Sequence, residues 1–222
     1  MNWFANNWSQ VLGLAGDHLA LSLPAIAISV LLAIPIGRLA RQRPRIGSPL
    51  LSAATLLYAI PALPMLILIP AIIGTPLRSA ATMIVALVLY GIALMVRTAA
   101  DAFGSVDPRV REGAISVGHS PRSVFWRVDL PLAVPVLVSG ARVVTVSTIS
   151  LVTIGALIGI PSLGSLLTDG FQRGIAGEVV TGVLATVLLA LVLDGALLLL
   201  GRLLTPWTRA ATPRRGRREA TA

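Results

Sequence analysis

The sequence predicts an all-α polytopic membrane protein with five transmembrane helices. Hydrophobic residues make up 55% of the 222 residues and charged residues only 12%, and the mean hydropathy is +0.87. A soluble domain of this size would have to expose large apolar patches. Several stretches without charge are long enough to cross the hydrocarbon core, which needs roughly 20 apolar residues in a helix. The arginines gather in every second connection between these stretches, as expected if those connections share one side of a membrane.

The apolar stretches define the expected domain organisation. Residues 1–17 lack a basic start, and Asn and Ser interrupt their apolar residues, so we expect a short extracytoplasmic helix in the membrane interface rather than a cleaved signal. Residues 18–206 form the membrane domain, and residues 207–222 form a basic tail that we expect in the cytoplasm. The five predicted spans are 19–37, 50–73, 79–98, 132–160 and 178–204.

The arginines indicate the orientation of the spans. All 18 basic residues are arginine, and the formal net charge is +9. Four, five and six of them lie in the first loop, the third loop and the tail region, whereas only Arg78 and Arg173 fall on the opposite side. The positive-inside rule therefore places the N-terminus outside and the C-terminus in the cytoplasm. This distribution favours a protein embedded in the lipid bilayer and argues against a nucleic-acid partner.

One polar segment, residues 106–130, separates the third predicted span from the fourth. Asp107 and Ser120 are each followed by proline, which favours helix starts because a side-chain oxygen caps free N–H groups and proline suits the first helical position. Gly118 lies between these two starts and is typical of a helix end. We therefore predict two short amphipathic helices joined at Gly118, the second ending at Leu130 where the next span begins. The simplest alternative is a solvated connector between spans.

This segment also contains a spaced motif. Glu-Gly-Ala occupies residues 112–114, a glycine follows after three residues, and Val-Asp-Leu-Pro follows after nine more. The arrangement resembles the EAA loop of binding-protein-dependent ABC importer permeases, whose pattern is Glu-Ala-Ala, three residues, Gly, nine residues, Ile, any residue, Leu-Pro. Two residues depart from that pattern, because Gly113 replaces an alanine and Val128 replaces the isoleucine. The ATPase-coupling residues implied by the resemblance are Glu112, Gly113, Ala114, Gly118, Leu130 and Pro131.

The resemblance extends over about residues 19–207. The stretches LSLPAIAISVLLAIPIGRLA, IPALPMLILIP and GALIGIPSLGSLLTDGFQRG are similar to the osmoprotectant branch of the family, which imports glycine betaine, carnitine, choline and related quaternary ammonium compounds. This similarity implies the type I importer permease fold in a bacterial cytoplasmic membrane, with residues 106–130 as the coupling loop. It also implies three partners, namely a cytoplasmic ATPase, an extracytoplasmic substrate-binding protein and a second permease copy, either identical or a sister chain.

The sequence shows no catalytic chemistry of its own. It has no Gly-rich phosphate loop and no lysine, so we expect a separate chain to hydrolyse ATP. It also has no cysteine and only two isolated histidines, so we expect no catalytic residue, no metal and no cofactor. Two alternatives remain open at this point. One is a permease of the same family for another small polar solute such as an amino acid, and the other is a stand-alone secondary transporter, which would predict internal inverted repeats.

Two features inside the predicted spans are candidates for function. Arg142 and Asp194 are charges at similar depth, and such charges usually face protein or water because lipid exposure is costly. We expect them to pair, directly or through Arg97, unless Arg142 extends to the headgroups instead. The run of residues 60–70 contains three prolines and is the best candidate for an irregular element that lines the solute pathway. The candidate pathway-lining residues are Tyr58, Pro61 and Pro64.

Overall fold

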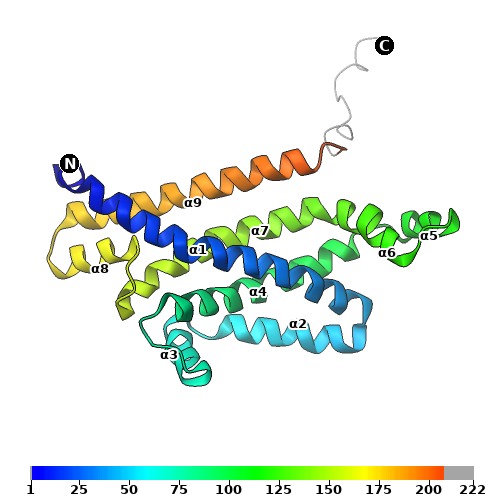
Figure 1. Cartoon of the computed structure of the whole chain (residues 1–222), viewed down its shortest axis with the longest axis horizontal. Coiled ribbons are helices and arrows are strands. Elements are labelled where there is room, and N and C mark those ends of the chain that lie inside the picture. Colours follow the sequence, from blue (N-terminus) through cyan, green and yellow to red (C-terminus); the bar gives the residue numbers. More distant parts are fainter. Residues whose placement is uncertain (1, 208–222) are drawn as a thin grey trace, which may run out of the picture.

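The computed structural model describes residues 2–207, and all secondary structure in that range is helical (Figure 1). The all-α prediction is therefore confirmed for the described region. Of the basic tail predicted over 207–222, only Trp207 lies among the described residues. In chain order the elements are α1 (Asn2–Gln42), α2 (Pro44–Ala59), α3 (Ala62–Ile73), α4 (Ala80–Gly104), α5 (Pro108–Ser116), α6 (Pro121–Val124), the π-helical turn η1 (Phe125–Asp129), α7 (Leu130–Val152), the 3-10 turn η2 (Thr153–Ile158), α8 (Gly164–Gln172) and α9 (Ala176–Leu204).

Within residues 2–207, four helices are long and apolar enough to cross a membrane. They are α1, α4, α9 and the continuous helix that contains α7. A fifth span is present if α2 and α3 are counted together, because this pair passes the same test but meets at a bend of 109°. Figure 1 shows the long helices side by side, with α5 and α6 projecting from one end of the bundle and α8 at the other. The membrane-spanning bundle agrees with the sequence prediction, and one of its spans is broken.

Small residues allow the central helices to approach one another closely. Helix α4 occupies the centre of the bundle, where it contacts α1, α2, α3 and α7. A Cβ added to Gly91 of α4 would lie only 2.2 Å from the hydroxyl oxygen of Ser29 on α1, and a Cβ added to Gly37 of α1 would lie 2.5 Å from the Cβ of Ala99 on α4. Lipid tails are as apolar as leucine, so close van der Waals packing of this kind holds helices together in a membrane.

Helix α1 is longer than the sequence prediction. We expected a short helix over residues 1–17. Two helices join at a kink at Asn7 (φ −125°, ψ 17°) within α1, and the second of them runs from there into the first span. No proline interrupts the sequence before the span, and Val11 is buried against Leu163 near α8. This packing supports a helix that extends past the length of a single span. A position of residues 1–17 outside the membrane stays a prediction.

The bend between α2 and α3 falls at Ile60 and Pro61. A residue before proline is disfavoured in the α conformation, and Ile60 is extended (φ −66°, ψ 127°). The Tyr90 hydroxyl of α4 donates a hydrogen bond to the Ile60 carbonyl, which the end of α2 leaves without a helical partner. The second predicted span, residues 50–73, is therefore two helices with a stabilised break, because a proline falls at its centre.

Candidate functional site

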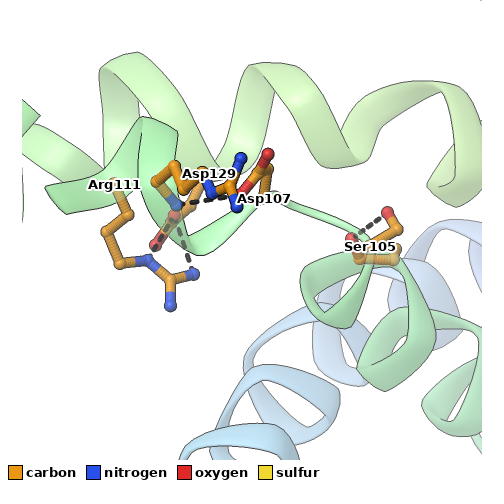
Figure 2. A network of polar contacts seen from close by, with 6 residues as sticks. Ser105, Asp107, Arg111 and Asp129 are labelled. Carbon is orange, nitrogen blue, oxygen red and sulfur yellow. Dashed lines mark hydrogen bonds and ion pairs between the residues drawn. The ribbon is translucent and has the colours of Figure 1, made fainter. Parts of the chain in front are cut away.

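The first helix of the polar segment, α5, begins and ends as the sequence predicts. The Asp107 carboxylate accepts a hydrogen bond from the Arg109 backbone N–H at 2.9 Å, so it caps the helix start (Figure 2). At the other end Gly118 has a φ of +90°, a left-handed conformation that favours glycine. The His119 backbone N–H then donates to the Ala114 carbonyl at 3.1 Å. Gly118 is thus the turn between the two short helices.

The second helix, α6, does not end where we predicted. Its start is capped by Ser120, whose hydroxyl accepts from the Ser123 N–H at 3.3 Å. We expected an end at Leu130 and Pro131, but α6 continues through the π-helical turn η1 into α7 without a break. The widened turn lets the helix pass Pro131, which has no N–H to donate. The second helix of the polar segment is therefore continuous with a membrane span.

An ion pair that the sequence analysis missed joins the two halves of the segment. Arg111 on α5 donates from Nε and Nη2 to one carboxylate oxygen of Asp129 in η1, at 3.0 Å and 2.9 Å, as Figure 2 shows. The Asp129 side chain is only 6% exposed. A buried carboxylate is costly unless it is paired and hydrogen-bonded, so this contact stabilises the angle between α5 and α7. Opposite charges eighteen residues apart give no sequence signal for such a pair.

Aromatic contacts fasten this helical loop to the bundle. The Phe125 ring packs 6.1 Å from the ring of Phe103 at the end of α4. The Arg38 guanidinium, near the end of α1, lies 3.7 Å from the centre of the Phe125 ring in a cation–π arrangement. Three spans, α1, α4 and α7, therefore meet at the base of the loop.

The outer face of the loop is exposed and partly apolar. We call residues 108–129 the knob. Four large apolar side chains of this projecting segment are exposed, a feature typical of surfaces that bind another protein. They are Val110, Ile115, Val117 and Trp126, which are 47%, 55%, 77% and 59% exposed. Among the residues predicted for coupling, Glu112, Gly113 and Gly118 are exposed, whereas Ala114, Leu130 and Pro131 are half-buried.

The two intramembrane charges form a bidentate ion pair with each other. Arg142 Nε lies 2.7 Å from one carboxylate oxygen of Asp194, and Nη2 lies 2.6 Å from the other. The pair links α7 to α9. Arg97 does not mediate it and instead lines a separate groove near the ends of α1, α2 and α4. A role for this pair in function stays a prediction.

The candidate pathway residues lie at the bend between α2 and α3. The Tyr58 ring is half-exposed and meets the Tyr90 ring edge to face at 6.0 Å. Pro61 directly precedes α3, and Pro64 lies in its first turn. Both prolines are exposed on the surface of the chain. The irregular element predicted here is present, whereas its contact with a solute stays a prediction.

The bundle with its projecting helical loop is typical of one class of protein, the membrane permeases that are driven by a separate ATPase. The fold resembles solved structures of the MetNI methionine ABC transporter in inward-facing conformations, with a TM-score of 0.76 over 88% of this chain and 97% of that chain at 21% identity. It also resembles an amino acid ABC transporter crystallised with histidines, with a TM-score of 0.67 over 93% and 96% of the two chains at 18% identity. At these identities the likeness establishes the fold.

Residues 25–210 match the family described as binding-protein-dependent transport system inner membrane component, and the chain belongs to this family. It is 31% identical to the osmoprotectant import permease protein OsmW of Salmonella typhimurium, over 93% of this chain and 97% of that protein. It is 25% identical to the choline transport system permease protein OpuBB of Bacillus subtilis, over 93% and 94%. The chain is therefore a membrane-spanning transport subunit of an ABC importer, and a separate ATPase and a binding protein belong to the same system.

Proposed function

We propose that this chain is the permease subunit of an ATP-driven importer for osmoprotectants, the quaternary ammonium compounds such as glycine betaine, carnitine and choline. Several proteins that are similar to this chain over nearly its whole length carry that function in their names. One is a glycine betaine/carnitine/choline permease of Bacillus subtilis that is 24% identical over 93% of this chain. The aromatic content is only 5%, which leaves few rings for a cage around a cation. Most of the solute selection is therefore assigned to the external binding protein.

The observation that carries the proposal is the rigid knob with its exposed apolar face. The knob docks in a cleft on the ATPase, with Glu112 near the surface of that subunit and Gly118 permitting the turn. When two ATPase subunits close on ATP, the docked knobs move together. The Arg111–Asp129 pair and the unbroken helix from α6 to α7 convey this movement into the membrane domain. Without such rigid connections the movement would be absorbed in the loop.

The importer contains two permease chains in this proposal. Four long helices and one bent pair are too few to enclose a solute path, so the path runs along the two-fold or pseudo-two-fold axis of a dimer. The partner is a second copy of this chain or a sister permease. The arginine distribution supports an N-terminus outside and the knob in the cytoplasm. Tyr58, Pro61 and Pro64 line the path at the bend between α2 and α3.

The test is uptake of labelled glycine betaine into vesicles that contain this chain together with the ATPase and the binding protein of its system. We expect uptake that requires ATP and that falls strongly in Gly118→Ala, because alanine is strained by about 1–2 kcal/mol in the left-handed conformation at that position. Gly113→Ala is the matched control, since a Cβ there meets nothing within 4 Å. ATP-independent uptake, or equal loss in both variants, would count against coupling through the knob.

A further inference from the structure

A groove between α7 and α9 exposes the intramembrane ion pair. Its volume is about 410 Å³. The side chains of Arg142 and Asp194 remain 35% and 23% exposed, so the pair faces the groove rather than the packed interior of the chain. The groove is lined by Ser139, Arg142, Val143, Val146, Ser147 and Asp194.

The position of the groove argues for contact with water. Arg142 lies near the middle of α7, with roughly 15 Å of helix on either side at 1.5 Å per residue. Ser139, Val143, Val146 and Ser150 of α7 are exposed on one stripe with helical spacing. Hydroxyl groups and a charge pair at this depth are costly against lipid tails, and such residues usually face a water-filled cavity or protein. This stripe of α7 is therefore a candidate to face the solute pathway of the proposed dimer.

We propose that Arg142 and Asp194 form a transient binding subsite for the zwitterionic solute, an inference that rests on the proposed function. A betaine carries a carboxylate and a quaternary ammonium group. The Arg142 guanidinium binds the solute carboxylate with two parallel N–H donors, as it now binds Asp194. The freed Asp194 carboxylate then faces the quaternary ammonium group. The Ser147 hydroxyl of the groove lining is available to the solute carboxylate, whereas the Ser139 hydroxyl donates to the Pro135 carbonyl.

The physical reason is that one zwitterion replaces both partners of the pair. Separating a partly buried ion pair leaves two uncompensated charges, which is unfavourable unless each charge finds a new partner. A betaine supplies one positive and one negative group, so both side chains stay paired when it enters. A cation such as choline supplies a partner for Asp194 only and leaves Arg142 unpaired. The subsite therefore favours zwitterions over simple cations and needs no aromatic cage, of which the groove shows none among its lining residues.

The first test is a variant that removes both charges and keeps the shape, Arg142→Gln with Asp194→Asn. We expect the ratio of glycine betaine to choline uptake to fall roughly tenfold or more, which corresponds to losing one charge-assisted contact. The wild-type complex is measured beside it, and ATP hydrolysis by the purified complex confirms that the variant assembles. An unchanged ratio in an active variant would overturn the subsite. If the wild-type complex imports no osmoprotectant at all, the proposed function fails instead.

A second measurement serves if the double variant does not assemble. The sequence contains no cysteine, so Val143→Cys, at a position 57% exposed in the groove, introduces a single thiol. We expect a water-soluble maleimide to label it and glycine betaine to slow the labelling more than choline does. Leu191→Cys on α9 is the control, because Leu191 is 64% exposed but does not line the groove. A Val143→Cys thiol that does not react, or that betaine does not protect, contradicts the proposal.

Discussion

The knob and the α7–α9 groove each contain one arginine–aspartate pair, and the two pairs differ in their surroundings. In the knob the Asp129 side chain is 6% exposed and the pair joins segments eighteen residues apart. In the groove the Asp194 side chain is 23% exposed and its partner is 52 residues away. A carboxylate without access to solvent has no alternative partner, whereas a carboxylate at a groove wall can be reached by a different partner. The same pair of side-chain types therefore acts as a fixed link in the knob and as an exchangeable contact in the groove.

The largest effect is expected when one charge of the groove pair is removed. Arg142→Ala leaves the Asp194 carboxylate without its ion-pair partner at the groove wall inside the membrane, so we expect roughly tenfold less assembled complex and uptake. The charge swap Arg142→Asp with Asp194→Arg restores a pair between α7 and α9. The measurement is the thermal midpoint of the purified complex, which we expect to recover in the swapped variant. Failure of the swap to recover any stability would mean that the two side chains do not support each other.

A smaller effect is expected in the knob. Arg111→Ala removes the partner of the buried Asp129 carboxylate, with an expected cost of about 1–3 kcal/mol and a looser link between α5 and α7. We expect ATP hydrolysis to persist while uptake per ATP falls several-fold. Arg109→Ala is the matched control, because Arg109 is exposed on the same helix and takes part in no ion pair within residues 2–207.

The double variant Arg111→Ala with Asp129→Ala sharpens this result. Removing both partners also removes the unpaired buried carboxylate, so stability should recover while the link between α5 and α7 remains absent. Uptake per ATP is then expected to stay low although the thermal midpoint returns towards the wild-type value. If uptake and stability recover together, the pair contributes to folding alone and does not convey movement from the knob to α7.

The smallest effect is expected at Gly113. Alanine at this exposed position of α5 meets no neighbour within 4 Å and restores the residue of the family pattern. We expect it to stabilise the helix by about 0.5–1 kcal/mol without loss of uptake. The measurement is the thermal midpoint of the complex together with the uptake rate. Reduced uptake here would show that the ATPase cleft requires the bare backbone of glycine.

Local features of the site were predictable because they depend on neighbours in the sequence. The caps at Asp107 and Ser120 and the left-handed turn at Gly118 follow from the preferences of single residues, and the structure contains all three. The pairing of Arg142 with Asp194 was one of the expected arrangements, because charges in lipid have few alternatives. The Arg111–Asp129 pair was not predicted, because a single sequence does not indicate which of several charged side chains come into contact in the folded chain.

The sequence by itself determined the class of fold, the approximate spans and the family, because hydropathy and motif spacing are properties of consecutive residues. Tertiary structure decided how far the kinked helix α1 extends before the first span, the 109° angle at the break that Pro61 causes, and the passage of α6 into α7 through a π-helical turn. The first two involve contacts between elements far apart along the chain, namely Val11 with Leu163 and the hydrogen bond from Tyr90 to Ile60. Helix propensity alone allows several backbone conformations at these positions, and packing against the neighbouring helices selects one of them.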